Sequence, residues 1–532
     1  MNTLINNHEN TNILDLPNEM LLAIMSKLSK IDVLYSLVGV NRQFDQLIID
    51  PFYIHDLDFT RKLLFDDISP IDKQTLDRIC GKILPRINDK VNKLTVEPLS
   101  IERIFHAVDY VQLNSLSFVN FSQEILLRHI LDNAVIHRLM TEQITCLHIQ
   151  VSDEVTSNFP VENHSNIFSL ILFMCKNLND LTFSHWFIGL GLTFFIYKLS
   201  STSCVSSTLT KLRIHVNTFD DCLFLLDGRL ESLSTLIINI VEIFNTSATI
   251  DNTKKLPKLK CFALTSYHHT SFYDSQIVPL LRRMSNLEEL TLFLSVIRME
   301  STYIDGIHLH DEILIHMPRL DKLMFSITTM LYNINAKIDL QSNDDIQRGF
   351  IEKEIYQVDS YVINDPSKLQ QECHIYSKPY PFDVFFNLNS RFPGAKFNKV
   401  RWLIMRDGDP FENELFKIIS QDFPFLKKLA IFNTAAQQNK RCSLPFITFL
   451  HLRELYVHLA HIDYAEQFLY ERNAHLPCLS SLEIRYETLS ILTNNFTNDA
   501  ARANCAKLQR LVIKEPFAHP QYFHSYFPLL QC

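Results

Sequence analysis

The feature that most constrains this fold is a six-residue pattern that returns along nearly the whole chain. Each copy has an apolar residue, two variable residues, a leucine, one variable residue and another apolar residue, as in LNSLSF and LEELTL. Clear copies begin at Leu113, Ile144, Leu178, Leu209, Leu233, Leu287, Leu320, Val400, Leu426, Leu452, Leu479 and Leu508, and weaker ones at Ile54, Val91 and Leu259. The starting positions step by 24 to 34 residues between Leu113 and Leu320, and by 26 to 29 after Val400. Such a period predicts a solenoid, whose units bury their apolar faces by stacking.

The pattern resembles the leucine-rich repeat, and the resemblance covers the chain from about residue 54 to its end. It implies an α/β solenoid in which each LxxLxL run is a short strand of a curved parallel sheet and helices return on the convex side. Residues 411–420 support such a helix, because Phe411, Leu415 and Ile418 have helical spacing. The asparagine that usually follows the strand in this family is mostly absent, so we expect irregular turns there.

One interval breaks the rhythm, since Leu320 and Val400 lie 80 residues apart. A structureless loop of that length would be unusual in a compact domain. We therefore predict degenerate repeats or an inserted excursion at 336–395. This segment would separate an N-terminal array, 51–335, from a C-terminal array, 396–532.

The residues before the repeats predict a small helical module at 13–50, preceded by a flexible leader at 1–12. Pro17 disfavours helix at the residue before it, so a helix is expected to begin near Asn18. Its apolar residues, Met20, Leu21, Ile24, Met25 and Leu28, have helical spacing. Asp32 is expected to cap a second helix and a third follows it. A unit of about 35 residues hides too little surface to bury all these groups within itself.

The module resembles the F-box, the segment that docks on a Skp-type adaptor. The residues that carry the resemblance are Leu16, Pro17, Glu19, Ile24, Leu28, Val33, Leu37, Val40, Phe44 and Leu47. The aromatic residue near the end of many F-boxes, often tryptophan, is represented only by Phe44. By this resemblance the adaptor-binding residues are Leu16, Pro17, Glu19, Ile24, Leu28, Val33 and Leu37. The alternative interpretation is an ordinary helical cap on the array.

Composition argues against several other classes of protein. The formal net charge is −9 and no run of lysine or arginine stands out, which disfavours nucleic acid as a partner. The most apolar stretch, 186–197, is shorter than the roughly 20 residues of a membrane span. The N-terminal residues lack the basic and apolar regions of a signal peptide. The 11 cysteines stand singly without a CxxC pair, which is typical of a reducing compartment, either cytoplasm or nucleus.

The sequence contains no pattern that indicates catalysis. It has no GxSxG, no HExxH, no glycine-rich phosphate loop, and no histidine pair with a cysteine or aspartate at ligand spacing. His268 and His269 are adjacent, but with 21 histidines in the chain such a pair is expected by chance. We therefore predict that the chain is not an enzyme, holds no metal and needs no cofactor.

The repeat predicts which side chains of each strand face outward, because alternate residues of a strand point to opposite sides. In the C-terminal array these outward positions are rich in arginine and aromatic groups, which dominate interface hot spots. The candidate substrate-binding residues are Arg406, Phe432, Tyr456, His458 and Arg485. A merely solvated sheet face would show the same alternation, so both interpretations stay open.

Taken together, the two resemblances imply a substrate receptor of an SCF-type cullin-RING ubiquitin ligase. The F-box would bind the Skp-type adaptor, and through it the cullin, while the repeats hold a protein substrate. The alternative is a leucine-rich-repeat binding scaffold or inhibitor whose first fifty residues only cap the array. The residues do not identify the substrate.

Overall fold

The computed structural model describes residues 13–62, 68–151, 162–184, 194, 196–198, 204–246, 254–299, 301–332, 341–355, 357–363, 370–438, 446–517 and 520–530. The predicted leader, 1–12, and most of the apolar stretch 186–197 lie outside these residues. The chain divides into two compact units. Unit 1 comprises residues 1–291 and 313–322, and unit 2 comprises 292–312 and 323–532. This division falls earlier in the chain than the break in the repeat.

The N-terminal module forms three short helices, α1 (Asn18–Met25), α2 (Lys30–Leu37) and α3 (Arg42–Ile48), followed by α4 (Pro51–Ile54). Pro17 occupies the position before α1, as its fixed backbone angle favours. The cap of α2 differs from expectation, because Ser29 rather than Asp32 caps this helix. The Ser29 side chain accepts a hydrogen bond from the Asp32 amide, which places Asp32 in the first turn.

The repeat pattern locates the strands of the first sheet, most of which lie in unit 1. In each copy a strand begins at the third residue of the pattern, so the leucine at the fourth position points into the core; Leu94, Leu116 and Leu147 are all fully buried. The strands are β1 (Asp56–Asp58), β4 (Lys93–Val96), β5 (Ser115–Phe121), β6 (Cys146–Val151), β7 (Asp180–Ser184), β8 (Lys211–Thr218), β9 (Thr235–Glu242), β10 (Cys261–Thr270), β11 (Glu289–Met299) and β12 (Lys322–Tyr332). Neighbours from β1 to β10 pair in parallel. The full sheet has twelve strands in the order β1-β4-β5-β6-β7-β8-β9-β10-β11-β12-β14-β13.

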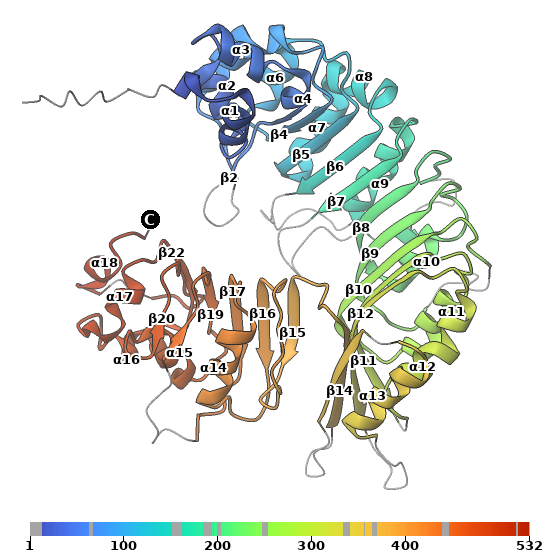
Figure 1. The fold of residues 1–532 in the computed structure, drawn as a ribbon, viewed down its shortest axis with the longest axis vertical. Helices are drawn as coiled ribbons and strands as arrows, with labels where there is room; N and C mark the ends of the chain where they lie inside the picture. Colours follow the sequence, from blue (N-terminus) through green and yellow to red (C-terminus); the bar gives the residue numbers. More distant parts are fainter. Residues whose placement is uncertain are drawn as a thin grey trace, which may run out of the picture. The chain divides into compact units, whose positions relative to one another are not determined.

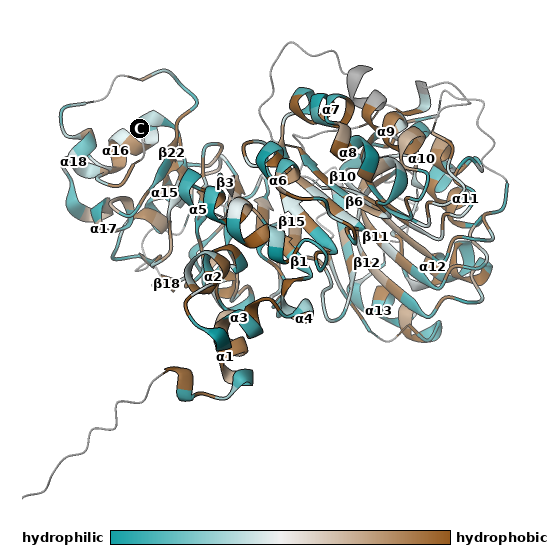
Figure 2. Cartoon of the chain, turned by 90° about the horizontal axis from the view of Figure 1, so that it is seen from above, coloured by the Kyte–Doolittle hydropathy of each residue, from teal (hydrophilic) through white to brown (hydrophobic). Residues whose placement is uncertain are grey.

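Helices return the chain between many of these strands and cover one face of the sheet (Figure 1). They include α5 (Lys73–Arg78), α6 (Ile101–Ala107), α7 (Gln123–Asp132), α8 (Ala134–Glu142), α9 (Glu162–Met174), α10 (Phe219–Leu225), α11 (Val278–Leu281) and α12 (Gly306–Glu312). Helix α7 is amphipathic, with Leu126 and Ile130 buried, and its two sides differ in colour in Figure 2. The parallel, helix-covered arrangement confirms the α/β solenoid-like class.

A backbone ladder joins successive repeats on the side where the strands begin. One carbonyl oxygen accepts two amide hydrogens from the next repeat: Asn92 accepts from Asn114 and Ser115 at 2.9 and 3.0 Å. The same bond pair recurs at His55, Asn114, Thr145, Asn179, Thr210, Ser234, Lys260 and Glu288, and in unit 2 at Asp383, Arg401, Lys427, Arg453 and Ser480. Because these bonds need no particular side chain, the coils stay in register although the asparagine of the family is mostly absent.

The first part of the segment at 336–395 is an antiparallel excursion, whereas Val384–Leu388, near its end, already pairs in parallel with the next strand and begins the second array. After α13 (Asn343–Glu352), strands β13 (Val358–Ile363) and β14 (Gln370–Ser377) pair antiparallel, and β14 also pairs antiparallel with β12. The excursion therefore ends the run of parallel pairing.

Unit 2 contains a second sheet that is wholly parallel, with the order β15-β16-β17-β19-β21-β22. Its strands are β15 (Val384–Leu388), β16 (Trp402–Arg406), β17 (Lys428–Phe432), β19 (Glu454–Tyr456), β21 (Ser481–Glu483) and β22 (Arg510–Val512). Helices α14 (Asn413–Asp422), α15 (Ile462–Leu469), α16 (Tyr486–Leu492), α17 (Arg502–Cys505) and α18 (Phe523–Tyr526) lie between or after these strands. The repeat thus resumes after the excursion.

Aromatic side chains fill the core where the excursion meets the second sheet. Phe385, Phe397 and Phe423 are almost fully buried, and the rings of Phe397 and Phe423 stack with centroids 4.8 Å apart. The ring of His374, from β14, lies edge-to-face with Phe385 at 5.1 Å. The many phenylalanines of the sequence therefore tie the antiparallel hairpin to the parallel array.

Candidate functional surfaces

Helix α1 and the turn that follows it present a stripe of apolar side chains to solvent. Met20, Ile24 and Leu28 follow one another at intervals of four residues and are 52%, 43% and 55% exposed. Leu21 and Met25, about 100° further round the helix, are buried within the module. The apolar residues of the helical pattern therefore fall into two groups, one buried and one exposed to solvent. We refer to Met20, Ile24 and Leu28 as the α1 stripe.

The remaining predicted adaptor-binding residues differ in their access to solvent. Pro17 and Glu19 are exposed, whereas Leu16 and Leu37 are half-buried. Val33 is only 1% exposed and lies inside the module. In this structure almost none of the Val33 side chain is therefore accessible to a partner.

Sequence reasoning left four exposed apolar groups out of the predicted contact set, namely Met20 of the α1 stripe, Val40, Ile13 and Phe52. Val40 is 60% exposed and follows Gly39, whose φ of 83° makes the turn after α2. Ile13 and Phe52 are 52% and 91% exposed. The one feature of the sequence that could have indicated the exposure of Phe52 is the Asp50-Pro51 pair. This pair is typical of a helix start, and Phe52 follows it in the single turn of α4.

Polar contacts hold the module on the first repeats of unit 1. The Lys30 ammonium donates to the Asp56 carbonyl at 2.9 Å, and partial burial lowers its pKa. Arg78 donates to the Val38 carbonyl at 2.9 Å, and Arg86 pairs with Asp45 at 3.0 Å. The pKa of Asp45 is lowered mainly by the hydrogen bond from the Gly39 amide. The α1 stripe is thus carried by a module that polar contacts anchor to the array.

The second surface is the open face of the parallel sheet of unit 2. Arg406 and Phe432 are aligned on neighbouring strands, and the guanidinium lies 5.6 Å from the ring centroid. On β16 the outward residues Trp402 and Ile404 are half-buried and Arg406 is exposed, while Leu403 and Met405 are fully buried. The alternation predicted from the repeat therefore holds on this strand.

Tyr456 also lies on this face, but its hydroxyl is engaged within the chain. It donates to the carboxylate of Glu454, which pairs with Lys428 at 2.8 Å. Burial is the main cause that raises the pKa of Tyr456, followed by this hydrogen bond. The ring edge, rather than the hydroxyl, is the part of Tyr456 that a partner could contact.

The two other candidates lie beyond the ends of their strands. His458 is half-buried, with its Nδ1 3.8 Å from Glu515. Arg485 is exposed and stands directly before α16, two residues after β21 ends, with buried Ile484 between. The structure therefore places all five predicted substrate-binding residues along one face or its immediate extension.

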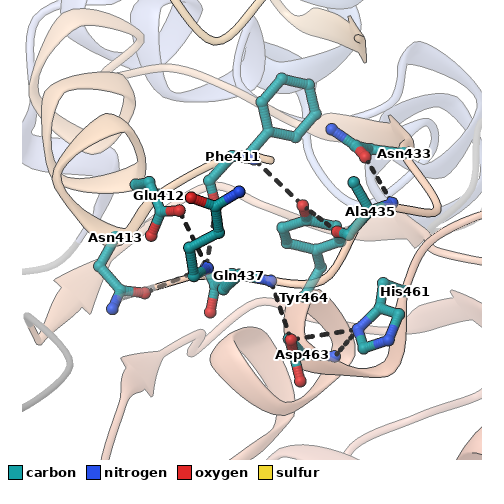
Figure 3. A network of polar contacts seen from close by, with 10 residues as sticks. Phe411, Glu412, Asn413, Asn433, Ala435, Gln437, His461, Asp463 and Tyr464 are labelled. Atoms are coloured by element: carbon teal, nitrogen blue, oxygen red, sulfur yellow. Dashed lines mark hydrogen bonds and ion pairs between the residues drawn. The ribbon is translucent and has the colours of Figure 1, made fainter. Parts of the chain in front are cut away.

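A polar network occupies the turns that follow β16 and β17 (Figure 3). The Tyr464 hydroxyl donates to the Ala435 carbonyl at 2.7 Å and accepts from the Phe411 amide at 3.0 Å. The Gln437 side-chain amide donates to the Phe411 carbonyl at 3.0 Å, and its backbone amide donates to Asp463 at 3.0 Å. These hydrogen bonds join residues in turns and at helix starts. The network therefore holds the loops in position, a task that a regular asparagine ladder performs in the leucine-rich repeat.

The described residues also bear on three other kinds of feature, namely metal ligands, reactive thiols and membrane-spanning helices. No group of three or more His, Cys, Asp or Glu residues within the described ranges could hold a metal ion. Burial raises the pKa values of the Cys175, Cys204, Cys222 and Cys505 thiols to about 12, so these groups are thiols at neutral pH. Among the helices that the structure describes, none has both the length and the apolar character required to cross a membrane.

The fold defines an α/β repeat protein with an exposed apolar stripe at one end of unit 1 and an open parallel sheet in unit 2. Comparison with known proteins adds no family to this description. Neither the protein-family models nor the curated proteins give a match to the chain.

Proposed function

We propose that the chain is a substrate receptor of an SCF-type ubiquitin ligase, in which the N-terminal module docks on a Skp-type adaptor. The observation that carries the proposal is the α1 stripe, a row of three exposed apolar side chains on the N-terminal module, to which Ile13, Val40 and Phe52 add further exposed apolar groups. An exposed row of this kind is typical of a surface that a protein partner covers.

The attachment of the module to the repeats supports the same function. A receptor of this type must hold its substrate at a defined position relative to the adaptor, since the gain in rate comes from proximity and orientation. The contacts of Lys30, Arg78 and Arg86 join the module directly to the first repeats. In this proposal the chain itself catalyses nothing, and the sheet face of unit 2 holds the substrate.

The test replaces Ile24 and Leu28 with serine and measures capture by a purified Skp-type adaptor. These residues are better targets than Leu16, because Leu16 is half-buried and its loss would also affect folding. Burying a whole side chain of this size is worth about 1.5 to 3 kcal/mol. Since roughly half of each is exposed, the double variant should bind about 10- to 100-fold more weakly.

A matched control removes two apolar groups that are equally exposed elsewhere. Leu131 on α7 and Ile491 on α16 are 55% and 60% exposed, so replacing both with serine should leave adaptor capture unchanged. If the unmodified protein fails to retain the adaptor, or the α1 variant retains it as well as the control does, the ligase function is wrong. A repeat scaffold or inhibitor without a ligase role would then be the better explanation.

A further inference from the structure

The sheet face of unit 2 has an imbalance of charge that indicates the kind of segment it binds. Among the described residues, Arg406, Arg485 and Arg510 have no acidic partner. Three carboxylates on or beside the same face each have a basic neighbour within the chain. Glu454 pairs with Lys428 at 2.8 Å, Glu483 pairs with Lys514 at 2.7 Å, and Glu515 lies 3.8 Å from His458.

We propose that this face binds an extended segment of a partner protein that carries acidic groups, carboxylate or phosphate, beside an apolar anchor. The inference rests on the proposed substrate-receptor function and names the chemistry of the substrate. Arginine suits this role because its planar guanidinium donates two parallel hydrogen bonds to a carboxylate or phosphate. The ring of Phe432 lies under Arg406, which leaves the edge of the guanidinium available for such bonds.

An aromatic patch on unit 2 provides the apolar anchor site. Phe293 packs against Phe382 and Phe386, with ring centroids 4.9 and 5.8 Å away, and Phe386 lies 6.5 Å from Trp402. Phe382, Phe386 and Trp402 remain half-buried, so each ring keeps part of its surface in water. Trp402 and Arg406 belong to the same face of β16, which brings the patch and the cations onto one continuous surface.

The spacing of the cations suits an extended peptide. Adjacent strands lie about 4.8 Å apart, so Arg406 on β16 and Arg485 beyond β21, three strands away, are separated by roughly 14 Å. An extended chain rises about 3.3 Å per residue, so acidic side chains about four residues apart would reach both. Arg510 begins β22, the next strand, and is available to a further acidic group.

A peptide fits the surface better than a nucleic acid does. The carboxylates of Glu454, Glu483 and Glu515 are interleaved with the cations, and a continuous phosphate backbone would pass close to them. The chain also has a net charge of −9, whereas nucleic-acid-binding domains are usually basic. Isolated acidic groups at defined spacing avoid this repulsion.

The test measures binding of the full-length protein to pools of degenerate 12-residue peptides by fluorescence polarisation. Two positions four residues apart are fixed as glutamate, phosphoserine, glutamine or lysine. We expect the glutamate or phosphoserine pool to bind at least tenfold more tightly than the glutamine pool, and the lysine pool to bind least. The tighter of the two acidic pools identifies carboxylate or phosphate as the preferred group.

Two variants with the same change in net charge locate the effect. Replacing Arg406, Arg485 and Arg510 with glutamine should reduce the affinity for the acidic pool to that for the glutamine pool. Replacing the exposed Lys399, Lys417 and Lys427 with glutamine should change it less than twofold, because these side chains lie off the face. Both variants should melt at the temperature of the unmodified protein, because exposed substitutions cost little stability.

Three results would overturn the inference: no preference for acidic pools, no binding of any pool, or equally effective competition by a twelve-nucleotide oligothymidine. An equal loss of binding in both variants would also exclude the face. The adaptor takes no part in this assay. A failure here therefore leaves adaptor docking by the α1 stripe intact, and a failure of adaptor capture leaves the peptide result standing.

Discussion

The burial of His374 makes the stability of unit 2 depend on pH. This side chain is 2% exposed within the aromatic core, and its Nε2 lies 2.9 Å from the Ser326 hydroxyl. Desolvation lowers its pKa from 6.5 to about 3, because the imidazolium cannot be hydrated there. The folded state thus holds His374 neutral over the range in which the unfolded chain accepts a proton.

The sign and size of the effect follow from the two pKa values. The pKa in the folded state is depressed, so the unfolded state binds more protons between pH 6.5 and about 3. The free energy of unfolding should therefore be unaffected by this group above pH 6.5 and should decrease as the pH falls below it. At pH 5 the expected loss is about 2 kcal/mol, since each pKa unit is worth about 1.4 kcal/mol.

The assay is urea unfolding at pH 7.5 and pH 5.0, followed by tryptophan fluorescence. The chain has 2 tryptophans, and Trp402 alone lies within unit 2, so replacing Trp186 with phenylalanine makes the signal report that unit. His374→Gln serves as the comparison because its amide can reach Ser326 but does not titrate. The glutamine variant should lose about 2 kcal/mol less than the parent between the two pH values. An equal pH dependence in both proteins would show that His374 is hydrated or protonated in the folded state.

Two further predictions concern the core and the thiols. Phe385→Ala should destabilise unit 2 by about 3 to 5 kcal/mol, because the ring is fully buried among aromatic neighbours, whereas Phe386→Ala on the open face should cost about half of that or less. Equal urea midpoints for the two variants would contradict the assignment of the two faces of β15. In a timed reaction with iodoacetamide, the exposed Cys478 should be modified well before Cys222 and Cys505, which are buried and have pKa values of about 12. Peptide mapping by mass spectrometry checks this order, and early modification of Cys222 would mean that its helix opens.

The sequence was sufficient to locate the strands that carry the repeat. In every copy of the repeat, strong or weak, the strand begins at the third residue of the pattern. Local information is enough for this, because the alternation of apolar residues decides which side of a strand faces the core. The same holds for α1, where the helical spacing and Pro17 define the helix.

The sequence did not determine which apolar residues of the N-terminal module remain exposed. Met20 and Val33 are similar in polarity, yet Met20 is 52% exposed and Val33 is 1% exposed. The difference depends on how α1, α2 and α3 pack against one another, and this packing involves residues that are distant along the chain. Periodicity identifies a helix that has more apolar side chains than one side can bury. Only the packed module shows which of these side chains remain exposed to solvent.

The tertiary structure alone decided the form of the excursion and the charge balance of the open face. The antiparallel pairing of β14 with β12 joins residues from 38 (Tyr332 with Gln370) to 50 (Ser326 with Tyr376) positions apart, and no local pattern in 336–395 specifies that partner. The repeat predicted that Arg406 and Arg485 face outward, but the pairing of Glu454 and Glu483 with lysines of neighbouring strands was not visible in it. The face of the sheet to which a side chain points is set locally, by alternation along its own strand. The side chains that it meets on neighbouring strands depend on the register of the whole sheet.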